Sequence, residues 1–185
     1  MAYVSIIHGG HRSGFCFNAA KQLQVLLDRV GVSSNLFNLA DYRFDYCCGG
    51  QPCQDDGICV HRDEITTVVI PKIAASEVLL FFTPTYFNMP PALLKNFMDR
   101  CNFLLTLANR KTNKYAAWIS GQTAKGEGSV ESCLSNITEF SQILELDSVG
   151  ANQSLFYEKQ AGDIALTDAD VFILEHLANE IVKLK

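Results

Sequence analysis

The chain has 185 residues, of which 48% are hydrophobic and 19% charged, and this length and composition suit one well-buried domain over residues 1–185 rather than two. The net charge is −5 and the charged residues form no run of one sign, so we expect no nucleic-acid partner and no membrane partner. The first residues enter a strand pattern without the parts of a signal peptide, and no apolar segment reaches membrane-spanning length, so we expect a cytoplasmic protein.

Short segments rich in β-branched and aromatic residues alternate along the chain with longer segments whose apolar residues recur every three or four positions. The first kind is typical of strands and the second of amphipathic helices. The predicted strands are residues 3–8, 33–39, 77–83, 114–120 and 148–157. The predicted helices are residues 17–30, 63–75, 90–105, 129–144 and 167–184.

Strict alternation of strand and helix predicts an α/β fold in which helices cover both faces of a parallel sheet, giving a three-layer sandwich. A five-stranded parallel sheet favours the doubly wound order 2-1-3-4-5 over a six-stranded alternative. In such a sheet a ligand binds outside the carboxyl ends of the strands, where the order reverses between the first and third. The loops after strands one, three and four should therefore form the site.

The first of these loops, "HGGHRSGFCFN" at residues 8–18, has the features of a phosphate cradle. Its glycines let backbone amides approach an anion closely, and the following helix offers its positive end. Arg12 and Ser13 add hydrogen-bond donors. The loop lacks the Gly-Lys-Ser/Thr of a P-loop and the pattern of a dinucleotide site, so it suits a single phosphate. The alternative is a tight turn that needs glycine only for its geometry.

The second loop, "TPTYFNMPP" at residues 83–91, predicts a site for a planar heteroaromatic ring. Its prolines stiffen a backbone that can bind the edge of the ring, while Tyr86 and Phe87 cover a face. The third loop, residues 120–129, is polar and rich in glycine and would close over the same site with Gly121, Gln122 and Thr123. Beyond Thr123 a plain surface loop is the alternative.

Two segments resemble the NADPH-dependent FMN reductase and iron-sulfur flavoprotein group, whose fold is flavodoxin-like. "TPTYFNMPPALLKNFMDR" is similar to the group's "SPVYFGNPSAQLKAFIDR", and "IIHGGHRSGFC" resembles its "GSPRKNGNT" phosphate loop. By order of elements the resemblance covers roughly three-quarters of the chain. It implies FMN, with the phosphate on the first loop and the isoalloxazine along the second. The implied phosphate residues are Gly10, His11, Arg12, Ser13, Gly14, Phe15 and Cys16, and the ring residues are Thr83, Pro84, Thr85, Tyr86, Phe87 and Asn88.

The first loop also departs from the group's pattern. Gly10 stands in place of its serine and His11 in place of its proline, and the loop is one residue shorter. Phe15 and Cys16 replace an Asn-Thr pair. Because two side-chain contacts to phosphate are thereby lost, backbone amides, Arg12 and Ser13 must carry more of the anion binding.

Seven cysteines, an odd number, indicate thiols or metal ligands rather than a disulfide framework. Iron-sulfur flavoproteins place C-x-x-C-x-x-C and a fourth cysteine where this chain has "CCGGQPCQDDGICVHRDE". Cys47, Cys53 and Cys59 match three of these places, Gly50 takes the fourth, and Cys48 could substitute only through a sharp turn. A four-iron cluster or a zinc ion held by thiolates needs four ligands, so the missing one favours a subunit contact or redox thiols instead.

The remaining cysteines and the histidines carry weaker signals. Cys16, Cys101 and Cys133 lie on helical patterns and are expected to be buried. The four histidines lack ligand spacing: His11 could touch the phosphate, and His8, His61 and His176 are expected at solvated loop or cap positions. Asp63 is predicted to cap its helix.

We interpret the sequence as an FMN-dependent oxidoreductase that takes hydride from NADH or NADPH and passes electrons to a small acceptor, such as a quinone, a nitro or azo compound, or free flavin. No catalytic side chain is expected, because the flavin supplies the chemistry. One alternative is an electron-transfer flavoprotein that uses an iron-sulfur cluster or redox thiols. A second is a non-enzymatic binding module of the same fold.

The helix predicted at 90–105 carries apolar residues around more of its surface than one packing stripe needs. We therefore expect a homodimer or homotetramer in which this helix and residues 46–60 pack across the interface. The alternative is that residues 46–60 fold back and cover the helix within their own chain.

Overall fold

The computed structural model describes residues 3–50, 52–55, 57–107, 109–121, 129–149, 154–158 and 165–184. Its centre is a parallel sheet of β1 (Tyr3–His8), β2 (Ser33–Asn38), β3 (Val78–Pro84) and β4 (Lys114–Gly121) in the order β2-β1-β3-β4. β5 (Asp147–Ser148) and β6 (Ser154–Glu158) both pair in parallel with β4, on its edge opposite β3. The predicted order 2-1-3-4-5 is confirmed, with the fifth strand divided into β5 and β6.

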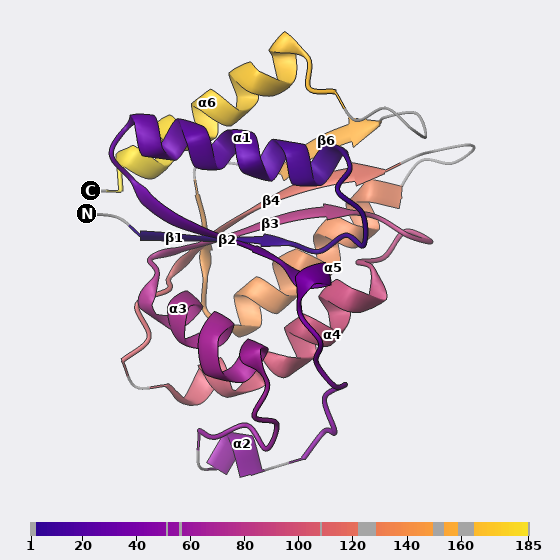
Figure 1. The fold of residues 1–185 in the computed structure, drawn as a ribbon, viewed down its shortest axis with the longest axis vertical. Helices are drawn as coiled ribbons and strands as arrows, with labels where there is room; N and C mark the ends of the chain where they lie inside the picture. Colours follow the sequence, from indigo (N-terminus) through magenta and orange to yellow (C-terminus); the bar gives the residue numbers. More distant parts are fainter. Residues whose placement is uncertain are drawn as a thin grey trace.

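Helices cover both faces of this sheet, as predicted (Figure 1). α1 (Phe15–Arg29) and α6 (Asp168–Val182) lie on one face, and α3 (Ile70–Ala75), α4 (Ala92–Arg100) and α5 (Ser129–Ile143) lie on the other. Each face has its own apolar core, because β1, β3 and β4 send buried side chains to both sides. Among the described residues, no helix is long and apolar enough to cross a membrane.

Several boundaries differ from the predicted ones. α1 begins two residues earlier than residue 17, because Phe15 and Cys16 are buried against the sheet. A π-helical turn, η2 (Ile65–Val69), precedes α3 and stands next to Pro71, whose ring nitrogen cannot donate to the preceding turn. α4 ends at Arg100 and is followed by a 3₁₀ turn, η3 (Asn102–Thr106).

Between β2 and η2 lies a stretch that we call the cysteine segment, residues 42–62. It follows the 3₁₀ turn η1 (Leu39–Asp41) and contains α2 (Pro52–Asp55), which packs near η3. In Figure 1 this segment lies at the end of the molecule beyond α3 and α4. It therefore covers α4 within its own chain, which was the alternative to packing across a subunit interface.

Candidate functional site

The carboxyl ends of β1, β3 and β4 meet at a small cavity of about 120 Å³. The cavity combines the first loop with the ends of β3 and β4, as expected for the point where strand order reverses. Its lining residues are His8, Gly10, Arg12, Gly14, Phe15, Cys16, Pro84, Tyr86 and Ser120.

Backbone and glycines, rather than side chains, shape the wall of the cavity at the first loop. A Cβ on Gly10 would lie 2.9 Å from Nε2 of His8 and 3.1 Å from Cδ of Pro84, so only glycine fits there without a shift. Gly14 is the N-cap of α1 and has no side chain to satisfy the amides of the first turn. The first turn, Phe15–Asn18, contains no acidic residue. The positive end of α1 is thus left for an anion.

His8 is the main correction to the sequence-based expectations, which placed it in solvent. Its side chain is only 1% exposed, because β1 is flanked by β2 and β3 and the ring of Phe17 lies 5.1 Å from the imidazole. The strand register pairs His8 with Asn38, and Nδ1 of His8 lies 2.8 Å from Oδ1 of Asn38. Burial lowers the pKa of His8, although the Asn38 hydrogen bond and the charge of Asp41 act in the opposite direction.

Cys16 joins the first loop to the end of β4. Its thiol is buried, as predicted, and its Sγ lies 3.1 Å from Oγ of Ser120 in a hydrogen bond. Burial raises the pKa of Cys16 to about 11, with the contact to Ser120 acting against that rise. Cys16 is therefore a neutral thiol at neutral pH, which lets it line an anion site without repelling the anion.

The second loop is held rigidly beside the cavity. The amide of Thr85 donates to the carbonyl of Ser120 at 2.9 Å, and the amides of Tyr86 and Met89 each donate to the other's carbonyl at 3.0 Å. Between them Phe87 and Asn88 adopt φ values of 50° and 65°, which form a turn that non-glycine residues rarely accept. Phe87 is fully exposed at its tip.

Most of the predicted site residues converge, with clear exceptions. Gly10, Arg12, Gly14, Phe15, Cys16, Pro84 and Tyr86 line the cavity, together with His8 and Ser120, which sequence reasoning had not assigned to it. His11 and Ser13 are exposed on the same loop, Thr83 is buried below it, and Gly121 ends β4. Gln122 and Thr123 lie outside the described residues.

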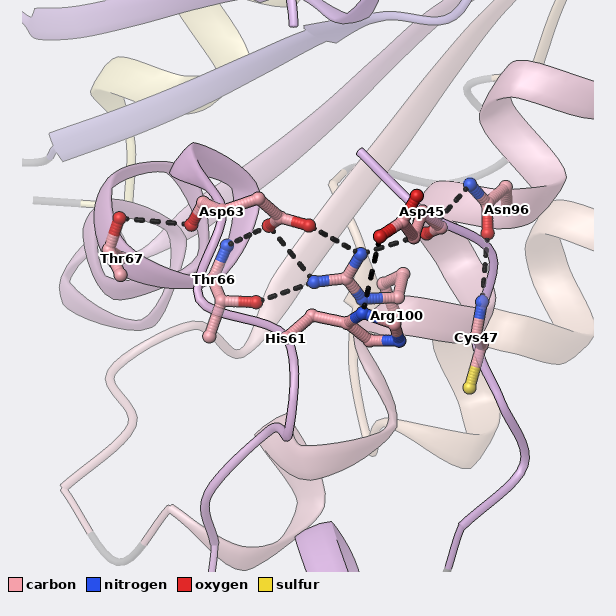
Figure 2. A network of polar contacts seen from close by, with 8 residues as sticks. All are labelled: Asp45, Cys47, His61, Asp63, Thr66, Thr67, Asn96 and Arg100. Carbon is pink, nitrogen blue, oxygen red and sulfur yellow. Dashed lines mark hydrogen bonds and ion pairs between the residues drawn. The ribbon is translucent and has the colours of Figure 1, made fainter. Parts of the chain in front are cut away.

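A second polar cluster surrounds Arg100 on α4 and is drawn in Figure 2. The buried guanidinium donates to both carboxylate oxygens of Asp63, at 2.8 and 3.0 Å, and to Oγ1 of Thr66 at 2.7 Å. It also donates to the backbone carbonyl of Asp45 at 2.9 Å. Arg100 thus ties both flanks of the cysteine segment to α4.

Asp63 acts as the helix cap that the sequence predicted, since its carboxylate accepts from the amide of Thr66 at 3.2 Å. Burial alone would raise the pKa of Asp63, but the hydrogen bonds from Arg100 and Thr66 lower it below its ordinary value. Asn96, one turn before Arg100, donates to the carbonyl of Asp45 at 3.3 Å and accepts from the amide of Cys47 at 3.2 Å. These side chains hold the start of the cysteine segment in place.

The cysteine segment does not fit a metal cluster in this arrangement. Cys59 is buried in the core, Cys48 is exposed, and the thiol of Cys53 donates to the carbonyl of Gly50 at 3.5 Å. Over the part of the chain that the structure describes, no three His, Cys, Asp or Glu side chains are placed to hold a metal ion. A larger cavity, of about 450 Å³, lies between this segment, α4 and α5, with Cys47, Leu105 and Ile143 among its lining residues.

Comparison with known proteins identifies a family. The model of the family described as NADPH-dependent FMN reductase matches residues 2–155. An iron-sulfur flavoprotein of Clostridioides difficile (strain 630) is 25% identical over 155 residues, which cover 75% of this chain and 69% of that protein.

Solved structures share the fold at low sequence identity. An NAD(P)H:quinone oxidoreductase from Methanothermobacter marburgensis has a TM-score of 0.70 and 16% identity, with 99% of this chain and 96% of that chain covered. The apo form of an NADH:FMN oxidoreductase has a TM-score of 0.68 and 14% identity, with 98% and 88% covered. At these identities the likeness concerns the flavodoxin-like fold.

Proposed function

Because the chain belongs to the NADPH-dependent FMN reductase family, we propose that the cavity at the ends of β1, β3 and β4 holds FMN, which takes hydride from NADH or NADPH and passes electrons to a small acceptor. Quinones, nitro or azo compounds and free flavin are the acceptor classes. The observation that carries this proposal is that the first loop, which suits an anion, lines one cavity together with Pro84 and Tyr86 of the hydrogen-bonded loop at residues 83–91.

The phosphate of FMN fits the cradle by size and by chemistry. The cavity volume of about 120 Å³ is below the roughly 300–1,000 Å³ of pockets that enclose whole drug-sized ligands, so it suits one group of the cofactor. Gly10 permits close approach of the backbone, and the amides at the start of α1 point their partial positive charge at the cavity. Arg12 adds the positive charge of a side chain at its rim.

The ring would lie along the second loop, outside the small cavity. Pro84 and Tyr86 line the boundary between the two, and the hydrogen bond from Thr85 to Ser120 fixes the backbone there. A backbone that is already rigid loses little entropy when it binds a flat ring edge. When bound, FMN supplies hydride and electron transfer, while the residues of this chain bind it, orient it and exclude water.

A second candidate function is electron transfer through an iron-sulfur cluster, because the similar protein of Clostridioides difficile is called an iron-sulfur flavoprotein. Cys47, Cys53 and Cys59 supply three of the four expected ligands. Their placement argues against this function, since no three His, Cys, Asp or Glu side chains among the described residues lie close enough together to hold a metal ion. We therefore rank it second.

The absorption spectrum of the purified protein separates these functions. FMN alone gives the spectrum of an oxidised flavin, and the chromophore released by denaturation should run as FMN rather than FAD on chromatography. A cluster would add broad absorption together with iron and acid-labile sulfide. NADH and NADPH oxidation with a quinone acceptor then tests turnover, and an FMN-loaded protein that oxidises neither would contradict the reductase function.

We also propose that the protein works in the cytosol as a homodimer or homotetramer. The seven cysteines of the sequence include only free thiols in the described structure, which suits a reducing compartment. Leu105 and Ile143 remain 45% and 58% exposed beside the larger cavity. A second copy packed over this face would bury them.

A further inference from the structure

The proton on the ring of His8 is positioned by a chain of two hydrogen bonds. Nδ2 of Asn38 donates to Oδ1 of Asp41 at 2.9 Å, and a carboxylate can only accept. The amide oxygen of Asn38 therefore faces His8, where it lies 2.8 Å from Nδ1. An amide oxygen also only accepts, so Nδ1 must carry the hydrogen.

The other ring nitrogen of His8 faces the cavity. A Cβ placed on Gly10 would lie 2.9 Å from Nε2, and both residues line the cavity at the start of α1. In a neutral imidazole only one nitrogen carries hydrogen. With Nδ1 occupied, Nε2 presents a lone pair to the place that an anion would take.

A fully ionised phosphate presents only acceptors, so it cannot bind next to this lone pair without one additional proton. The proton converts Nε2 into a charged donor, and charge-assisted hydrogen bonds to phosphate are strong. We propose that His8 couples the binding of FMN at this site to the uptake of one proton, which Nε2 then donates to the phosphate. This inference rests on the proposed function and adds a pH-dependent control of cofactor affinity.

The groups around His8 set the direction of the pH dependence. Asp41, acting across Asn38, favours the charged ring, whereas burial disfavours it and lowers the pKa of His8 in the free protein. On the α1 side, the ring of Phe17 contacts the imidazole, and Nζ of Lys21 lies 4.9 Å from the Phe17 centroid.

Among the described residues that line the cavity, the titratable ones besides His8 are Arg12, Cys16 and Tyr86. Arg12 lines the same cavity and is exposed on the first loop. The Cys16 thiol is neutral at neutral pH, since burial raises its pKa to about 11. The free ring is thus neutral at neutral pH, and the bound phosphate supplies the charge that favours protonation.

The sign of the linkage follows from these two states. Phosphate binding raises the pKa of His8, so protons are taken up between the pKa of the free protein and that of the complex. The affinity for FMN should rise as pH falls through this window and level off below the free-protein pKa. Riboflavin, which lacks the phosphate, should show no such dependence.

Titration calorimetry in buffers of different ionisation enthalpy measures the coupling directly. At about pH 7.5, where His is ordinarily neutral, FMN should bind with uptake of about one proton and riboflavin with about none. His8→Gln keeps an amide donor without a titrating group and should bind FMN with no uptake. His176→Gln is the matched control, because that residue is exposed on α6, and it should retain the uptake of the unmodified protein.

The outcomes distinguish this inference from the proposed function. FMN binding without proton uptake, or uptake that persists in His8→Gln, overturns the role of His8 and leaves the FMN site intact. If FMN does not bind, the proposed function fails, and inorganic phosphate then decides the inference. In that case the pKa of His8 is measured by ¹⁵N NMR of the ring with and without phosphate. A rise on phosphate addition supports the coupling, and an unchanged pKa overturns it. If His8→Gln does not fold, ¹⁵N NMR of the His8 ring in the unmodified protein decides the inference: a rise in the pKa of His8 on FMN addition supports the coupling, and an unchanged pKa overturns it.

Discussion

At the scale of single residues, the site depends on positions where a side chain is absent or neutral. Gly10 leaves room between His8 and Pro84, and Gly14 leaves the first turn of α1 without a cap. Cys16 contributes an uncharged thiol. No Asp or Glu is among the described residues that line the cavity, and the absence of such a charge favours a phosphate group.

Gly10→Ala should destabilise the protein by about 1–3 kcal/mol, the usual cost of an added group in a packed site. The new Cβ would lie 2.9 Å from Nε2 of His8 and 3.1 Å from Cδ of Pro84, and neither ring can move freely. Gly14→Ala is the matched control, since its Cβ would have no heavy atom within 4 Å. Urea unfolding of both variants measures the difference, and equal midpoints would contradict the crowding at Gly10.

Arg12→Ala should weaken FMN binding and leave riboflavin binding unchanged. A charge-assisted hydrogen bond contributes about 1.5–3 kcal/mol, or roughly 10- to 100-fold in affinity, with the lower end expected for an exposed arginine. Arg29→Ala, at the opposite end of α1, is the control and should bind FMN normally. Fluorescence titration with both ligands is the measurement. Equal losses for FMN and riboflavin would place Arg12 away from the phosphate.

At the scale of secondary-structure elements, α1 and α4 have different tasks. α1 directs its uncapped end at the cavity, whereas α4 begins at Ala92, directly after the ring-binding loop, and anchors the cysteine segment through Arg100. The polar residues Asn96 and Arg100 of α4 are buried because the cysteine segment covers them. The cysteine segment thus covers part of the α4 surface that a second subunit was expected to cover.

Arg100→Leu should destabilise the protein by about 3–5 kcal/mol, because it leaves the Asp63 carboxylate without its buried partner. The lower end is expected, since the Asp63 side chain retains 18% exposure. Lys95→Ala on the same helix removes only an exposed pair with Asp99 and should cost at most about 1 kcal/mol.

Limited proteolysis reports the local consequence of the Arg100 substitution. Cleavage within residues 42–62 should accelerate in Arg100→Leu and remain slow in Lys95→Ala, because only the first variant releases the cysteine segment from α4. An unchanged cleavage rate in Arg100→Leu would mean that the apolar contacts of the segment hold it without Arg100.

At the scale of the whole molecule, the small cavity and the larger cavity lie at different parts of the surface. The cavity opens at the carboxyl edge, while the larger cavity of about 450 Å³ lies at the cysteine segment, α4 and α5. Tyr46 and Ile58 in this segment are 78% and 50% exposed. Exposed apolar side chains on the segment and beside the larger cavity suit an interface.

Sedimentation at micromolar concentration should give a mass of at least twice the 20.5 kDa of the chain, in line with a homodimer or homotetramer. Ile143→Lys, an exposed position on α5, should shift the protein toward the monomer by placing a charge in the interface. Phe172→Lys is the control, because Phe172 is 71% exposed on α6, which lies on the other face of the sheet. A single 20.5 kDa species for the unmodified protein would contradict the predicted assembly.

The order of elements, the layers and the place of the cavity at the carboxyl ends of the strands were predictable from the sequence. Local periodicity decides which face of an element is buried, and strand-helix alternation leaves few topologies for a parallel sheet. The same local reasoning identified a helix whose positive end follows the first loop, the stiff loop at residues 83–91 and the cap at Asp63, and the structure has all three, with α1 starting two residues earlier than predicted.

The contacts that complete the site were decided only by the tertiary structure. His8 meets Asn38, 30 residues later, and Cys16 meets Ser120, 104 residues later, because strand register and helix packing place their side chains together. Sequence periodicity describes each element by itself and carries no information on which side chains of two elements lie opposite one another. For that reason the sequence placed His8 in solvent, and the fold placed it between β2 and β3 with its ring facing the cavity.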